Sequence, residues 1–342
     1  MKHFNKTLAA ALVSCGILAG NALPAASTDM VTVGNIGNAN DTTGYGGVGY
    51  IFDISKYEVT LNQYSTFLNA VAKTDTYSLY NVNMANNVNV AGITRSGSSG
   101  SYSYTVTGSG NRPVTYVSWF DAARYVNWLD NGQPVNVGQV AGTTETGAYA
   151  LNGATSGIIP RSLAGSGYAL PTESEWYKAA FYQPAAQGGP ASSYWPFATR
   201  SSAFPDSRVP NSTYQNSGNF YYNDFLANGY NGGYAVNNST ATPTGSAITD
   251  VGAYTLANSF YGTFDQAGNA AEWTEGVSGS SRAVRGGSWG DSNVGSSSRS
   301  TSSPTSENQY LGFRIIDVPE PGVISFLALG MAVLAWQRKR AI

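Results

Sequence analysis

The chain has 342 residues, of which 42% are hydrophobic and only 11% are charged, and its formal net charge is −2. This length allows one large domain or two small ones, and the apolar fraction is sufficient for a sizeable core. The composition argues against a nucleic-acid partner, because phosphate recognition requires clustered Lys and Arg side chains. The only cysteine is Cys15 and the only histidine is His3, so the rest of the chain has no disulfide and no thiol or imidazole ligand.

Residues 1–26 have the pattern of a signal peptide. Two lysines precede an apolar segment at residues 7–20, and small residues follow it. We therefore predict cleavage near Ala26 and an exported protein. The motif Leu12-Val-Ser-Cys15 resembles a lipoprotein signal, and lipidation of Cys15 is an alternative. Because the apolar segment continues beyond Cys15, cleavage near Ala26 is favoured.

Three helices are predicted, each beginning with a capping box. Thr60 is followed three residues later by Gln63, Ser118 by Asp121, and Thr172 by Glu175. In such a box the hydroxyl accepts a hydrogen bond from a free backbone N–H, and the later side chain bonds back to the cap. Apolar residues follow with helical spacing, most regularly at positions 64, 67, 68 and 71.

Strands are short and loops are long in this sequence. We predict strands at residues 50–54, 283–285 and 312–316. Residues 183–250 are rich in Gly, Asn, Ser and Pro with scattered aromatic residues, which favours ordered loops, since disordered segments contain few aromatics. The pattern predicts a single α+β domain over residues 30–317.

A series of motif blocks carries a family resemblance. In chain order the blocks are Lys56-Tyr-Glu-Val-Thr60, Arg112-Pro-Val-Thr-Tyr-Val-Ser-Trp-Phe-Asp-Ala122, Leu170-Pro-Thr-Glu-Ser-Glu-Trp176, Phe264-Asp-Gln-Ala-Gly-Asn-Ala-Ala-Glu-Trp273, Arg282-Ala-Val-Arg-Gly-Gly-Ser-Trp289 and Leu311-Gly-Phe-Arg314. Their order resembles that of the formylglycine-generating enzyme, or sulfatase-modifying factor, family. The resemblance implies a loop-rich, C-type-lectin-like variant of the α+β fold.

The resemblance also implies a calcium ion. By motif position its ligands would be the carboxylates of Glu58, Asp265 and Glu272 and the backbone carbonyls of Gly268 and Ala270. Calcium takes roughly six to eight oxygen ligands of mixed type, which a tight loop can supply. The alternative is that Glu58 and Glu272 accept backbone hydrogen bonds in the core.

Members of this family oxidise a substrate cysteine with a copper ion that two cysteines hold. Counted from Ser288 towards Arg299, the corresponding positions of this chain are Asp291 and Ser296. Cu(I) selects soft thiolates, whereas Asp and Ser offer hard oxygen ligands. We therefore expect no copper, no oxidation of cysteine by the family mechanism, and no catalytic residue at these positions.

Several large side chains of the last third flank the expected groove: Arg285, Trp289, Arg299, Tyr310 and Arg314. The arginines have two interpretations. They either pair with buried carbonyls and carboxylates of the scaffold, or line a cleft for an anionic or hydroxyl-rich ligand. Residues 289–310 are mostly Ser, Thr, Asn, Gly and Asp, a composition typical of adaptable binding loops.

The C-terminal segment, residues 318–342, resembles a PEP-CTERM sorting signal. Pro319, Glu320 and Pro321 precede an apolar stretch at residues 322–336 and the basic Arg338-Lys-Arg340. In Gram-negative bacteria that make extracellular polysaccharide, an exosortase is the expected partner of such a signal. An ordinary membrane anchor is the alternative, although the apolar stretch is shorter than the span of about 20 residues that a bilayer requires. Both interpretations place the domain outside the cytoplasm.

These observations predict an exported binding or structural module of the cell envelope or extracellular matrix, at the surface or secreted after C-terminal processing. The expected partner is an exopolysaccharide or a surface protein, with membrane contact through the C-terminal segment. One alternative is a family enzyme with non-standard chemistry that uses Asp291, Ser296 and nearby arginines. Another is a surface receptor with a diversified loop at residues 289–310.

Overall fold

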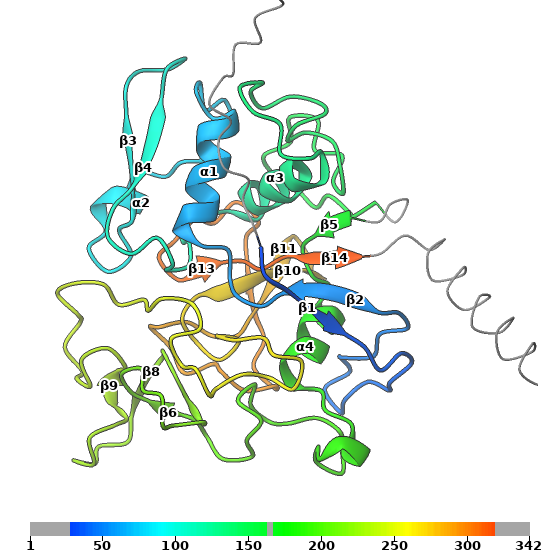
Figure 1. The fold of residues 1–342 in the computed structure, drawn as a ribbon, viewed down its shortest axis with the longest axis vertical. Coiled ribbons are helices and arrows are strands. Elements are labelled where there is room, and N and C mark those ends of the chain that lie inside the picture. Colours follow the sequence, from blue (N-terminus) through cyan, green and yellow to red (C-terminus); the bar gives the residue numbers. More distant parts are fainter. Residues whose placement is uncertain (1–27, 163–166, 319–342) are drawn as a thin grey trace, which may run out of the picture.

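Two four-stranded sheets lie at the centre of the computed structural model, which describes residues 28–162 and 167–318 (Figure 1). The first sheet is antiparallel, in the order β1 (Met30–Val33), β2 (Phe52–Ser55), β14 (Ile316–Val318) and β5 (Gly167–Ala169). The second has the order β12 (Ser300–Ser302), β11 (Ser281–Arg285), β10 (Ala271–Ser278) and β13 (Leu311–Gly312), with β13 parallel to β10. The fold is mixed α/β, and loops make up much of it.

The three predicted helices are confirmed, each beginning directly after its predicted cap. They are α1 (Leu61–Val71), α3 (Trp119–Asp130) and α4 (Glu173–Phe181). Both halves of every capping box are formed; in α3, for example, the Asp121 N–H donates to Ser118 Oγ at 3.1 Å and the Ser118 N–H donates to Asp121 Oδ2 at 2.8 Å. The short α2 (Asn83–Asn86) and the 3-10 turn η1 (Ala185–Gln187) were not predicted.

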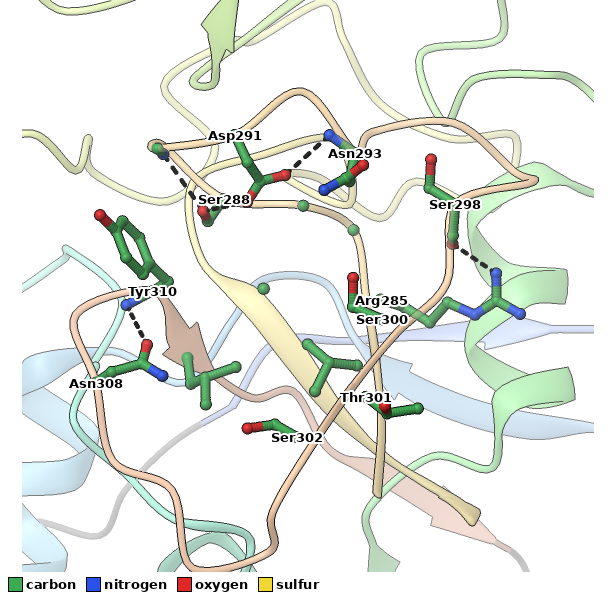
Figure 2. A pocket seen from close by; sticks show the side chains of 16 residues that line it. Arg285, Ser288, Asp291, Asn293, Ser298, Ser300, Thr301, Ser302, Asn308 and Tyr310 are labelled. Carbon is green, nitrogen blue, oxygen red and sulfur yellow. Dashed lines mark hydrogen bonds between the residues drawn. The ribbon is translucent and has the colours of Figure 1, made fainter. Parts of the chain in front are cut away.

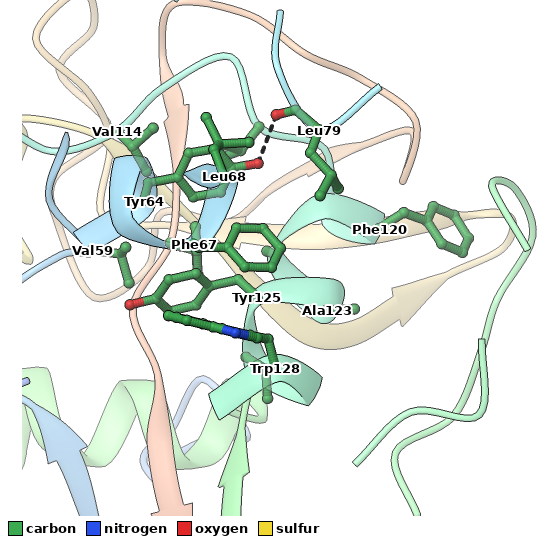
Figure 3. Packing of buried hydrophobic residues seen from close by; sticks show 14 of the residues in the cluster. Val59, Tyr64, Phe67, Leu68, Leu79, Val114, Phe120, Ala123, Tyr125 and Trp128 are labelled. Atoms are coloured by element: carbon green, nitrogen blue, oxygen red, sulfur yellow. Dashed lines mark hydrogen bonds between the residues drawn. The ribbon is translucent and has the colours of Figure 1, made fainter. Parts of the chain in front are cut away.

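The main core lies between α1, α3 and the sheets. Aromatic rings of the two helices interlock there, with Phe67 5.4 Å from Tyr125 and 5.3 Å from Trp128 between ring centroids (Figure 3). The hydroxyl of the buried Tyr64 donates to the Leu79 carbonyl at 2.8 Å, so its polar atom is satisfied (Figure 3). Since aromatic side chains bury large areas, this cluster provides much of the hydrophobic stabilisation of the domain.

The prediction of one continuous strand at residues 312–316 is wrong. The segment leaves the second sheet after Gly312 and joins the first sheet at Ile316, so that residues 313–315 connect the two sheets. In this connection the Phe313 carbonyl accepts from the Val59 N–H at 2.9 Å, and the Ile315 N–H donates to Ser55 Oγ at 3.1 Å. These hydrogen bonds, one to the end of β2 and one to the segment after it, replace the ladder of a continuous strand.

Elsewhere the predicted strands are confirmed with shifted ends, as β2 and β11. Residues 183–250 are mainly ordered loops, as predicted, with only short strands: β6 (Asp206–Ser207), β7 (Ser217–Gly218), β8 (Tyr221–Asn223) and β9 (Gly232–Tyr234). The remaining hairpin joins β3 (Ile93–Ser96) to β4 (Ser103–Val106). Aromatic contacts hold the loops; Phe204 and Tyr222, for example, lie 4.8 Å apart between ring centroids.

The predicted signal peptide lies outside the described residues, and so does the predicted sorting segment with its hydrophobic helix, except for Val318, which ends β14. Within residues 28–162 and 167–318, no helix combines the length and the apolar character needed to span a membrane.

The α3 capping box allows a stability test. Replacing Ser118 with Ala removes the cap and one donor to the buried Asp121 carboxylate, and we expect a loss of about 1–2 kcal/mol in the free energy of unfolding, measured in urea. The matched control Ser103→Ala, at an exposed hairpin hydroxyl, should change it by less than about 0.5 kcal/mol. Equal losses in the two variants would contradict the role assigned to the cap.

Candidate functional site

A pocket of about 280 Å³ opens beside the turn that follows β11 (Figure 2). Its floor is apolar, formed by Ala271, Val284 and Leu311. Its remaining lining is polar or glycine: Arg285, Gly286, Gly287, Ser288, Gly290, Asp291, Asn293, Ser298, Ser300, Thr301, Ser302, Asn308 and Tyr310. We call this cavity the Asp291 pocket.

The Gly286-Gly287 turn brings the backbone close to the polar side of the pocket. Gly287 has φ +68°, a conformation that favours glycine. A Cβ atom at Gly287 would lie 2.9 Å from the Asn293 carbonyl oxygen and 3.1 Å from Asp291 Oδ1. Glycine at this position therefore allows the loop at residues 291–293 to fold back against the end of β11.

The Asp291 carboxylate is fixed by two hydrogen bonds. Ser288 Oγ donates to Asp291 Oδ2 at 2.6 Å, and the backbone N–H of Asn293 donates to Oδ1 at 2.8 Å (Figure 2). A carboxylate offers about four lone-pair positions, so each oxygen can accept one further hydrogen bond. Asp291, one of the two positions predicted for the lost cysteines, thus lines the pocket as a pre-oriented acceptor.

Tyr310 lines the pocket beside Ser288, across from Ser298 (Figure 2). Its ring lies 5.0 Å from that of Trp289, and a Cβ atom at Gly290 would lie only 2.5 Å from Tyr310 Cε1. Its N–H donates to Asn308 Oδ1 at 2.9 Å. Trp289, predicted to line the groove, instead lies buried behind Tyr310 and donates from Nε1 to the Gln309 carbonyl at 3.1 Å.

Arg285 lines the pocket with its stem, but its guanidinium points away towards α4 (Figure 2). Its Nε donates to Glu173 Oε1 at 2.9 Å, and its Nη1 donates to the carbonyls of Ser298 and Ser296 at 2.8 and 3.2 Å. Arg299 binds the same carboxylate, with Nη2 2.9 Å from Glu173 Oε2, and does not line the pocket. The second predicted cysteine position, Ser296, also lies outside the lining and supplies its carbonyl to Arg285.

Arg314 is not at the pocket, which corrects its predicted place in the groove. It is fully buried and pairs with the fully buried Glu272, with 2.7 Å between Nη2 and Oε1. It also donates to the carbonyls of Ser55 and Phe264, at 3.0 and 2.8 Å. Arg314 therefore pairs with buried carbonyls and a carboxylate of the scaffold, the first of the two interpretations of the arginines, and does not line a cleft.

The predicted calcium ligands are close together but engaged with protein groups. Glu272 pairs with Arg314 and also accepts a hydrogen bond from Trp176 Nε1 at 2.7 Å. Glu58 Oε1 accepts a hydrogen bond from the Ala270 N–H at 3.1 Å. Burial, then repulsion from Asp265 and Glu272, raises the pKa of Glu58 well above its ordinary value, and burial raises the pKa of Asp265 to about 6.

Within the described ranges, no group of three or more His, Cys, Asp or Glu side chains has an arrangement that could hold a metal ion. In the arrangement that the structure shows, the carboxylates of Glu58, Asp265 and Glu272 do not fit a calcium coordination shell, because Arg314 neutralises Glu272. The binding of a calcium ion, with the carbonyls of Gly268 and Ala270 among its ligands, stays a prediction from the sequence.

Sequence reasoning found Arg285, Asp291 and Tyr310 and missed the other lining side chains. Ser298 and Asn308 lie in loops, whereas Ser300, Thr301 and Ser302 form β12. All five fall within residues 289–310, whose polar composition was the available signal. The apolar floor came from strands β10, β11 and β13, and only their pairing brings its three residues together.

Comparison with known proteins supports the family resemblance. A family model described as sulfatase-modifying factor enzyme 1-like domain matches residues 48–318. No curated protein sequence matches the chain.

Similar solved structures include CarF, with 22% identity, coverage of 86% of this chain and 100% of that chain, and a TM-score of 0.47. Variable protein 1 of Treponema denticola has 20% identity, coverage of 85% and 95%, and a TM-score of 0.46. PvdO from Pseudomonas aeruginosa has 17% identity, coverage of 85% and 92%, and a TM-score of 0.41.

Breaking the buried Arg314–Glu272 pair should destabilise the protein strongly. Arg314→Met leaves Glu272 buried and unpaired, and we expect a loss of about 3–5 kcal/mol in the free energy of unfolding, measured in urea. The double variant Arg314→Met/Glu272→Leu should lose less, since Glu272 is then no longer left as an unpaired buried charge. The control Arg200→Met, at an exposed arginine, should lose less than about 1 kcal/mol. A double variant no more stable than Arg314→Met would contradict this account.

Proposed function

We propose that this chain, which belongs to the sulfatase-modifying factor enzyme 1-like family, is an exported binding module rather than a cysteine oxidase. The Asp291 pocket is its ligand site, and the ligand is rich in hydroxyl groups, as a polysaccharide is. The C-type-lectin-like character expected from the motifs belongs to the same proposal.

The chemistry of the pocket lining is the observation that carries this proposal. Ala271, Val284 and Leu311 form an apolar floor, and hydroxyl and amide side chains surround it. A sugar ring has the matching surface, with C–H groups on its faces and hydroxyls around its edge. Sites for small ligands commonly combine apolar walls with a few placed polar groups.

The same lining argues against the family's oxidation chemistry. Asp291 lies in the pocket and Ser296 lies outside it, so the two positions of the expected cysteine pair do not both line it. The only cysteine of the chain is Cys15, within the predicted signal peptide. No thiolate pair is therefore available to select Cu(I).

The terminal segments supply the cellular context of the proposal. The signal-like residues 1–26 and the Pro319-Glu-Pro321 segment suggest export and exosortase-type sorting in a bacterium that makes exopolysaccharide. The exopolysaccharide of the host is therefore the partner that we propose, at the cell surface or in the extracellular matrix.

Calorimetric titration of the purified full chain with host exopolysaccharide tests this function. We expect saturable binding, and a loss of about fivefold or more in affinity in Tyr310→Ala, because an aromatic platform contributes roughly 1 kcal/mol or more to such contacts. Tyr310→Phe, which retains the ring, should bind nearly as wild type.

Phe225→Ala is the matched control, since Phe225 is 89% exposed and does not line the pocket. Titrations with calcium and with chelator separate a metal-dependent ligand from a metal-free one. Absence of binding in both conditions would contradict the proposed partner. Binding unaffected by Tyr310→Ala would place the ligand elsewhere.

A further inference from the structure

We infer that the Asp291 pocket selects sugar units by charge, so that amine-bearing and neutral units bind and carboxylate-bearing units are rejected. This inference rests on the proposed function and names the ligand class of the same site. It makes Asp291 the residue that determines specificity.

The first observation is the fixed orientation of the Asp291 carboxylate. Its two oxygens are held by Ser288 Oγ and the Asn293 N–H, and both retain room for another donor. Hydroxyl and ammonium groups of a ligand can donate to these oxygens, and the bond from an ammonium is the stronger because it joins opposite charges. A ligand carboxylate has no proton to donate and would meet a like charge.

The second observation is that the pocket has no free cation to offset Asp291. Among the described residues that line it, Arg285 is the only basic one. Its Nε and Nη1 are committed to Glu173 and to the carbonyls of Ser296 and Ser298. A ligand carboxylate would therefore have to compete with an intact buried ion pair.

The remaining nitrogen of Arg285 does not change this conclusion. Nη2 has no hydrogen-bond partner, but it is buried, and the guanidinium carbon lies 4.6 Å from the centroid of the Tyr45 ring. That ring face accepts the positive charge by a cation–π interaction. Figure 2 shows the guanidinium directed out of the pocket, on the side opposite Tyr310.

The other polar side chains of the lining are uncharged. They belong to Ser, Thr, Asn and Tyr residues, which donate to and accept from hydroxyls without regard to ligand charge. The preference between charged ligands consequently depends on a single side chain. Removing that one charge should abolish it while binding of neutral sugars persists.

Three trisaccharides with one β-1,4-gluco backbone test the inference: cellotriose, its 2-amino analogue (the glucosamine trimer) and its 6-carboxylate analogue (the glucuronate trimer). Affinities of the purified full chain are measured by calorimetry at low salt and mildly acidic pH, where the sugar amines are protonated and the sugar carboxyls are ionised. We expect the amine trimer to bind about three- to tenfold more tightly than cellotriose, and the glucuronate trimer to bind more weakly by a similar factor, as for partly exposed charge pairs.

Asp291→Asn is the test variant, because it keeps the oxygen acceptor and removes the charge. It should bring the three affinities to within about threefold of one another, with that for cellotriose little changed. Asp250→Asn is the matched control; it removes the same charge at an exposed position outside the lining and should keep the wild-type order. Thermal unfolding of each variant verifies that it is folded.

The outcomes separate the inference from the function on which it rests. Binding in which the glucuronate trimer equals or exceeds the amine trimer, or in which Asp291→Asn keeps the wild-type order, overturns charge selection and leaves the saccharide site in place. Binding of none of the trisaccharides overturns both. Trilysine represents a protein partner, and tighter binding of trilysine than of the amine trimer would overturn the saccharide assignment in favour of a peptide.

Discussion

The buried pair of Arg314 and Glu272 is the interaction on which the rest of this loop-rich fold depends. Both side chains are fully buried, and the guanidinium also reaches the carbonyls of Ser55 and Phe264. It therefore joins β10, the connection between the two sheets, the end of β2 and the loop that contains Phe264. A chain with short strands leaves many buried carbonyls without a ladder partner, and each costs free energy if it stays unsatisfied. A buried guanidinium, with five donors in a planar fork, can satisfy several of them at once.

The same use of arginine accounts for the pocket. Arg285 ties the loop carbonyls of Ser296 and Ser298 to Glu173 at the start of α4, so the loop is held from behind by its backbone. The side chains that follow, such as Ser300 and Thr301 of β12, line the cavity. Because the Arg285 guanidinium is bonded to these protein groups, it does not face a ligand in the pocket. Asp291 is then the charged side chain that a ligand meets.

The sequence predicted the features that depend on local chemistry. The capping boxes located α1, α3 and α4, and the motif blocks identified the family. Pairing of Arg314 within the scaffold was one of the two interpretations, but its partner Glu272 and the burial of Trp289 could not be predicted, because each depends on contacts distant in the chain. The break after Gly312 has the same cause: Phe313 bonds to Val59, beyond the end of β2, and Ile315 bonds to Ser55, the last residue of β2. Asp291 was placed by counting from a motif, and its partners Ser288 and Asn293 are close to it in sequence.

Amide hydrogen exchange of the full chain, with and without the glucosamine trimer, tests most directly the central claim that this pocket is the binding site. The account predicts slower exchange confined to Ala271 and residues 284–311 when the trimer is bound, because these residues contain the whole lining. The amides of α1, which contribute no lining residue, should be unchanged. Protection elsewhere, with residues 284–311 unaffected by bound trimer, would contradict the account.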